Sequence, residues 1–118
     1  VLIHTGREAR SRAVPGWQLV RGAAGLHPGI ARWLHDRHAA GVGGDGASDP
    51  YPSLVAGVSE PFHQLALVSM GMPLFDNLAL EELAAAAAER NQWTFLFIAA
   101  PLPLQRGSGS LVNALAVF

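Results

Sequence analysis

An imidazole and a carboxylate interrupt an otherwise apolar passage of the sequence, EPFHQLALVSMGMPLFDNL, at residues 60–78. The two groups belong to His63 and Asp76. A polar group without a partner costs free energy in a protein core, so each of them needs one. Imidazole and carboxylate together suit a divalent ion such as zinc or manganese. We therefore predict that His63 and Asp76 are metal ligands. The alternative is structural: a partly buried histidine, and an aspartate that caps a helix.

The elements around His63 and Asp76 can bring the two side chains together. A helix is predicted at residues 60–70, with Ser59 as its N-cap, and a strand is predicted at residues 72–78. His63 then lies in the first turns of the helix, and Asp76 lies at the end of the strand. A helix that turns back into a strand can bring its start close to the end of that strand. We expect both side chains to face one site.

Strands and helices alternate along the chain, which predicts the α/β class with a mostly buried sheet. Apolar or small-residue runs predict further strands at residues 1–5, 40–45, 93–104 and 111–118. Helices are predicted at residues 28–40 and 79–90 from the spacing of their apolar residues. Residues 7–25 are rich in Arg, Gly and Ala, and they are predicted to form a loop with at most one turn of helix.

Composition excludes several classes of partner. The chain has 118 residues, a formal net charge of -1 and only 14% charged residues. A nearly neutral chain has no electrostatic footprint for nucleic acid or for an anionic membrane surface. No apolar run is long enough to span a bilayer, and the absence of cysteine excludes disulfides and thiolate metal sites. Half of the residues are hydrophobic, so we expect another chain or a further segment to cover apolar surface.

The first residues, VLIHTG, are predicted to form a strand at once, without the basic start of a signal peptide. We therefore expect a cytoplasmic protein, of which this chain is one part.

A glycine pattern in the chain carries less information about function. Gly41, Gly43 and Gly46 match the dinucleotide-binding pattern G-x-G-x-x-G, but Pro50 and Pro52 prevent the helix that the pattern needs after it. Nucleotide binding is therefore not predicted.

Three further histidines have structural interpretations. His35 and His38 are three residues apart at a predicted helix end, a spacing that could ligate a metal. We interpret them as a solvated pair near the negative end of the helix dipole. His4, in the first predicted strand, is interpreted as a core histidine with a satisfied hydrogen bond.

The chain as a whole resembles the C-terminal half of the cyclase family, which includes bacterial kynurenine formamidases and isatin hydrolase. The resemblance is carried, in order, by VLIHTG, HPGIARWLHDRHAAGVGGD, PFHQLALVSMGMPLFDNLALEEL and FLFIAAPLPLQRGSGSLVNALAVF. It covers nearly all 118 residues, and APLPLQRGSGSLVNALAV is its most specific part. It implies a swivelling β/β/α fold, of which residues 1–118 are a single partial domain.

The resemblance implies a metal-dependent hydrolase of arylformamidase type, which opens amide or lactam-like bonds with a metal-activated water. The family's main metal motif, H-x-G-T-H-x-D, and its acid-base histidine belong to the N-terminal half, so the catalytic residues are expected in that missing segment. The family's second-metal ligands fall on His63 and Asp76, with Asp76 standing where Glu is commoner. Asp45 matches an acidic position of the family, and it either lines the substrate pocket or caps a loop.

The partners expected from this resemblance are a small amide or lactam-like substrate, the missing N-terminal segment and further copies in a homo-oligomer. The residues present would then supply second-site ligands and pocket wall, and we expect the chain alone to be inactive. An alternative is a non-catalytic α/β module that binds a partner through exposed apolar surface.

Overall fold

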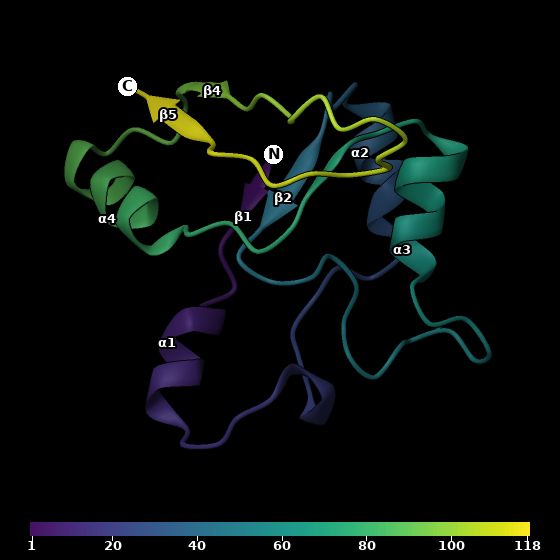
Figure 1. Cartoon of the computed structure of the whole chain (residues 1–118). Helices are drawn as coiled ribbons and strands as arrows, with labels where there is room; N and C mark the ends of the chain where they lie inside the picture. Colours follow the sequence, from purple (N-terminus) through teal and green to yellow (C-terminus); the bar gives the residue numbers. More distant parts are fainter. The chain divides into compact units, whose positions relative to one another are not determined.

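The computed structural model describes all residues of the chain, Val1–Phe118. It contains both helices and sheets, and it divides into two compact units, Val1–Glu81 and Glu82–Phe118 (Figure 1). The prediction that residues 1–118 form a single partial domain stays a prediction. None of the helices has the length and apolar character needed to cross a membrane.

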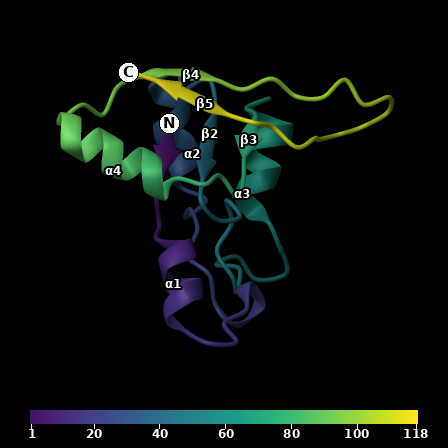
Figure 2. The same cartoon turned by 60° about the vertical axis from the view of Figure 1, so that its left-hand side comes forward.

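A parallel three-stranded sheet organises the first unit. Its strands are β1 (Leu2–Ile3), β2 (Val42–Gly44) and β3 (Leu74–Phe75), in the order β1-β2-β3. Figure 2 shows β2 in the middle, with β3 beside it. Glycine at position 43 lets the strands approach, because a Cβ there would lie 2.9 Å from the Cβ of Phe75. The three strands fall within predicted ranges, but each is shorter than its range.

Helices connect these parallel strands, as the crossover between parallel neighbours requires. The helix α2 (Ile30–Asp36) lies between β1 and β2 in the chain. The helix α3 (Pro61–His63) continues directly as a π-helical segment, η2 (Gln64–Ser69), before β3. The predicted helix at residues 60–70 is therefore present, and its second part has the wider π-helical turn, with the Met70 N–H bonded to the Leu65 carbonyl at 3.0 Å.

The core of the first unit lies between these helices and the sheet. Leu34 of α2 and Phe62 of α3 are fully buried, and Val42 of β2 is 1% exposed. Ala31, Ala66 and Met72 complete the cluster. Because Phe62 immediately precedes His63, the packing of this core also fixes where the His63 backbone lies.

The prediction of a loop with at most one turn of helix over residues 7–25 is wrong. This stretch contains a seven-residue helix, α1 (Arg7–Ala13), and a short 3-10 helix, η1 (Leu19–Arg21). Two interactions support α1: Arg12 forms an ion pair with Glu8, one turn away, at 2.8 Å, and the Arg7 N–H donates to Asp45 at 2.9 Å. The second comes from a distant part of the chain, so local sequence did not indicate it.

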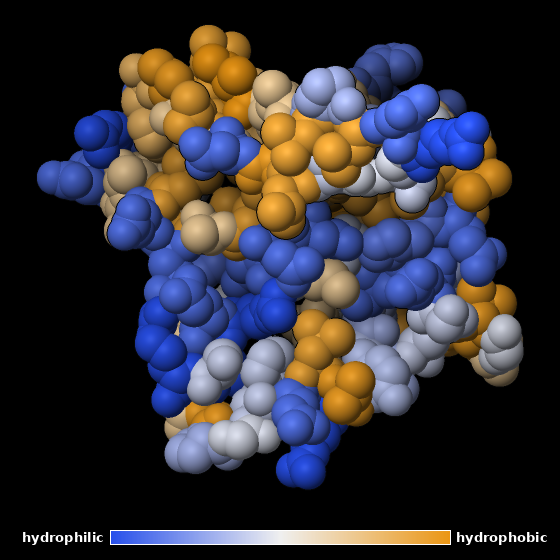
Figure 3. Space-filling model, in the orientation of Figure 1, coloured by the Kyte–Doolittle hydropathy of each residue, from blue (hydrophilic) through white to orange (hydrophobic).

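The second unit contains the antiparallel strands β4 (Leu96–Ile98) and β5 (Leu115–Val117), and most of α4 (Glu81–Arg90). The strands are much shorter than the predicted ranges 93–104 and 111–118. Many of their large apolar side chains are exposed, including those of Leu96, Ile98, Leu115 and Val117. Figure 3 shows hydrophobic surface gathered over β4 and β5.

We expect Phe62→Ala to lower the free energy of unfolding by about 3–5 kcal/mol, because it removes a fully buried ring from the core. Val68→Ala is the control, since Val68 is 82% exposed on the neighbouring η2 and its truncation should change stability by less than about 0.5 kcal/mol. Urea denaturation followed by circular dichroism measures both. Equal losses in the two variants would contradict this placement of the core.

Candidate functional site

The carboxyl ends of the three parallel strands lie at one edge of the sheet, the edge where α/β proteins commonly bind ligands. Thr5 follows β1, Asp45 follows β2 and Asp76 follows β3. The backbone joins these ends closely: the N–H groups of Asn77 and Leu78 donate to the carbonyls of Gly46 at 3.0 Å and Gly44 at 2.9 Å. This edge therefore gathers polar groups from distant parts of the chain.

The structure brings His63 and Asp76 together, as the sequence predicted. The Nε2 atom of His63 lies 3.0 Å from Oδ2 of Asp76. The Nδ1 atom of the same ring lies 2.6 Å from Oδ2 of Asp49, whose side chain is 5% exposed. The imidazole thus spans two carboxylates, and about a fifth of it is exposed to solvent. The role of His63 and Asp76 as metal ligands stays a prediction.

Asp49 is the residue of this site that sequence reasoning missed. Its carboxylate accepts the backbone N–H groups of Phe62 at 2.7 Å and of His63 at 2.9 Å, and so caps the start of α3. The prediction that Ser59 caps this helix is wrong, since Glu60 holds the N-cap position and the N–H groups of Phe62 and His63 donate to Asp49 instead. The actual cap lies more than ten residues upstream, where a local capping pattern does not reach.

Asp76 is held by a second residue of the same loop. Both the backbone N–H and the hydroxyl of Ser48 donate to Oδ1 of Asp76, at 3.0 and 2.5 Å. Its other oxygen, Oδ2, faces His63. His63 is partly buried and both of its ring nitrogens have a carboxylate partner, as the structural alternative also expects, while the carboxylate of Asp76 contacts Ser48 and His63.

The charge state of His63 depends on burial and on its two carboxylate neighbours, which act on its pKa in opposite directions. Burial lowers its pKa, while the hydrogen bond to Asp49 and the charge of Asp76 raise it. The net result is a pKa above the ordinary value of 6.5. Because folding raises this pKa, the protonated ring stabilises the folded protein fully below pH 6.5, and the contribution is lost as pH rises through the folded-state pKa.

Asp45 ties the end of β1 to the start of α1. Its side chain, 3% exposed, accepts the N–H and the hydroxyl of Thr5 at 2.7 and 2.8 Å and the N–H of Arg7 at 2.9 Å. Burial raises the pKa of Asp45, but these hydrogen bonds outweigh it and lower the pKa below 3.8. Asp45 also borders a hollow of about 250 Å³ beside Trp17 and Asn77. The structure therefore shows the structural role, and a substrate-pocket role stays a prediction.

The other histidines lie apart from this cluster. His35 is largely exposed, as a solvated residue should be, and its ring lies 3.5 Å from Asp36. His4 is not a core residue, because a third of its side chain is exposed and its nearest charged partner is Asp45 at 3.7 Å. The two-residue strand β1 ends before His4, so His4 does not follow the alternation expected for a longer buried strand.

The fold and this site define a mixed helix-and-sheet chain with a histidine–carboxylate cluster at the edge of a parallel sheet. Its structure is similar to a crystal structure described as a "novel cyclase", with a TM-score of 0.85 and 26% sequence identity. The match covers 99% of this chain and 39% of that one, so this chain spans well under half of its neighbour's length. The likeness supports a relation to the cyclase family. Scans against family models and against curated proteins find no match.

We expect nuclear magnetic resonance titration of the metal-free protein to show a pKa for His63 above 6.5, because both ring nitrogens face carboxylates. Asp49→Asn should lower that pKa, since it removes the carboxylate whose hydrogen bond is the largest single cause that raises it. Asp36→Asn, which alters an exposed aspartate beside His35, is the matched control and should leave His63 unchanged. A His63 pKa that does not respond to Asp49→Asn would show that the contact does not form in solution.

Proposed function

We propose that this chain is part of a metal-dependent hydrolase that cleaves amide or cyclic amide C–N bonds, as kynurenine formamidases and related arylformamidases do. The observation that carries the proposal is the 3.0 Å approach of His63 Nε2 to Asp76 Oδ2, in a chain whose structure is similar to that of a cyclase. A swivelling β/β/α fold for the complete protein, a homo-oligomeric state and a cytoplasmic location belong to the same proposal.

The donor set fits a divalent ion. Zinc bonds of about 2.0–2.2 Å to nitrogen and oxygen place neighbouring ligand atoms of a tetrahedral site about 3.3 Å apart. The separation of 3.0 Å between His63 and Asp76 is within a few tenths of an ångström of that value. Both side chains are partly exposed, so an ion can reach them. An imidazole nitrogen and a carboxylate oxygen are ligands that zinc and manganese accept.

Asp49 prepares His63 for this role. A metal-bound histidine commonly donates its other ring N–H to a carboxylate, which fixes the tautomer and the orientation of the ring. At 2.6 Å from Nδ1, Asp49 is placed to accept that hydrogen. With an ion bound, the lone pair of Nε2 would face that ion, on the side where Asp76 lies. Ser48 plays the corresponding part for Asp76, since it binds Oδ1 and leaves Oδ2 directed at His63.

His63 and Asp76 would supply only part of a catalytic metal site. No set of three or more His, Asp or Glu side chains in the chain is arranged to hold a metal ion by itself, whereas catalytic zinc sites use three protein ligands. When bound, the ion would lower the pKa of its water toward about 7 and polarise the scissile carbonyl. We propose that a segment outside these 118 residues adds the remaining ligands and the acid-base histidine. The 39% coverage of the cyclase neighbour supports this division.

The exposed apolar side chains of β4 and β5 agree with the need for such a further segment or a second copy of the protein. They are also the observation that favours the alternative, a non-catalytic module that binds a partner. The two functions differ in one measurable respect, because only the hydrolase requires a metal ion at His63 and Asp76.

We expect the longer protein that includes an H-x-G-T-H-x-D segment to hydrolyse N-formylkynurenine or a cyclic amide, and to lose that activity when a chelator removes the metal. His63→Ala should also lower the metal content, measured by atomic absorption. Asp36→Asn is the control with unchanged metal content. Activity that survives complete chelation would exclude the metal mechanism, and unchanged metal in His63→Ala would remove this residue from the site.

We expect Asp49→Asn to weaken zinc affinity by about 10–100-fold in the same longer protein, the usual effect of removing a carboxylate behind a metal-binding histidine. Competition with a chromophoric chelator measures the affinity. Long-range nitrogen-15 spectra of the zinc-loaded native protein should show the His63 proton on Nδ1, whereas the variant at the same zinc concentration should show a mixture of protonation states. Unchanged affinity and an unchanged tautomer, in a variant with a native circular dichroism spectrum, would contradict this role for Asp49.

A further inference from the structure

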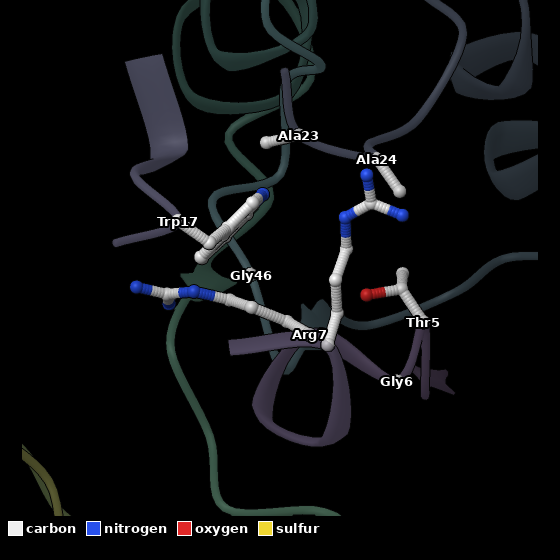
Figure 4. A pocket seen from close by; sticks show the side chains of 8 residues that line it. Thr5, Gly6, Arg7, Trp17, Ala23, Ala24 and Gly46 are labelled. Carbon is white, nitrogen blue, oxygen red and sulfur yellow. The ribbon is translucent and has the colours of Figure 1, made fainter. Parts of the chain in front are cut away.

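A hollow of about 180 Å³ lies beside the start of α1. Neither His63 nor Asp76 lines it. Arg7, Arg10 and Trp17 border it, together with Thr5 and the small residue Gly46. Figure 4 shows the ring of Trp17 on one side of the hollow and the side chain of Thr5 on the other. No acidic side chain lines it, so its walls carry the positive charge of two guanidinium groups and an aromatic ring.

The arginines of α1 are not equivalent in their partners. Arg12 pairs with Glu8 and also with Glu81. Arg7 donates to the Asp45 carbonyl at 3.3 Å and to the Asn77 side chain. Arg7 and Arg10 both border the hollow and neither forms an ion pair, but of these two only the guanidinium of Arg10 also makes no hydrogen bond within the chain.

The carboxylate of Asp45, which is hydrogen-bonded to two residues of this lining, does not neutralise that charge. Asp45 is buried and accepts three hydrogen bonds from Thr5 and Arg7, so its oxygens are directed at those donors. A guanidinium offers a planar fork of donors that matches a carboxylate, and arginine favours such pairing over a point contact. The free group at Arg10 is therefore suited to a small carboxylate ligand.

The Trp17 ring and the volume of the hollow favour a ligand that also carries an aromatic ring. A cavity of about 150 Å³ is large enough for a benzene ring. The hollow beside Trp17 is slightly larger, at about 180 Å³. An aromatic ring gains from stacking or edge contact with an indole, in addition to the apolar area that it buries. Ala23 and Ala24 add small apolar surface to the same wall.

We propose that this hollow binds a small planar aromatic carboxylate, with its carboxylate on Arg10 and its ring against Trp17. The hollow shares no lining residue with the cluster of His63, Asp49 and Asp76. Binding there therefore does not depend on whether that cluster holds a metal ion.

Benzoate is the probe, and the 118-residue chain is titrated with it while the amide resonances are followed by nuclear magnetic resonance. Shifts should gather at Thr5, Arg10, Trp17 and Gly46. Arg10→Gln, which removes the charge of an exposed side chain, should weaken binding about fivefold or more. Arg32→Gln removes an exposed arginine on α2 and should leave the affinity unchanged. Benzamide, which has the ring without the charge, and acetate, which has the charge without the ring, should both bind more weakly than benzoate.

Four results would overturn the proposal. One is the absence of saturable benzoate binding, and another is an equal effect of Arg10→Gln and Arg32→Gln, which would indicate only a general response to net charge. The third is acetate binding as tightly as benzoate, because the ring would then have no role. Shifts confined to Trp33 or Trp93 would likewise place the aromatic contact elsewhere.

Discussion

The buried carboxylate of Asp49 is the constraint on which the site depends. It accepts two backbone N–H groups at the start of α3 and faces the Nδ1 atom of His63 at 2.6 Å. A buried charge without such partners costs several kcal/mol. The hydrogen bonds from α3 therefore stabilise Asp49 in its buried position, and Asp49 in turn holds the start of α3 against its loop. The position of the imidazole is therefore a consequence of satisfying a carboxylate that is itself removed from solvent.

The same physical solution recurs along the edge of the sheet. Asp45 accepts two donors from Thr5 and one from Arg7, and Asp76 accepts two from Ser48. Each aspartate thus ties the end of one strand or loop to another segment by charge-assisted hydrogen bonds. Asp76 differs from Asp45 in one respect that matters for function, because one of its oxygens faces an imidazole nitrogen in a partly exposed position. That difference separates a structural aspartate from a candidate ligand.

Some features of the site followed from sequence patterns. His63 and Asp76 stand out as polar groups among apolar neighbours, and a helix followed by a strand brings them together as expected. Asp49 and Ser48 did not stand out, because polar residues in a loop with prolines are ordinary. Their function comes from partners that are distant in sequence. For the same reason Ser59 was an attractive N-cap, although Asp49 takes that role.

The sequence by itself determined the alternation of helices and strands, the neutral surface charge and the two polar residues at the edge of the sheet, because these depend on local periodicity and composition. Only the tertiary structure decided the rest. It placed the helix α1 where a loop was predicted, shortened the strands and put His63 between two carboxylates. The start of α1 and the position of His63 depend on hydrogen bonds between residues that are 13 to 40 positions apart, and the preferences of neighbouring residues do not determine such pairings.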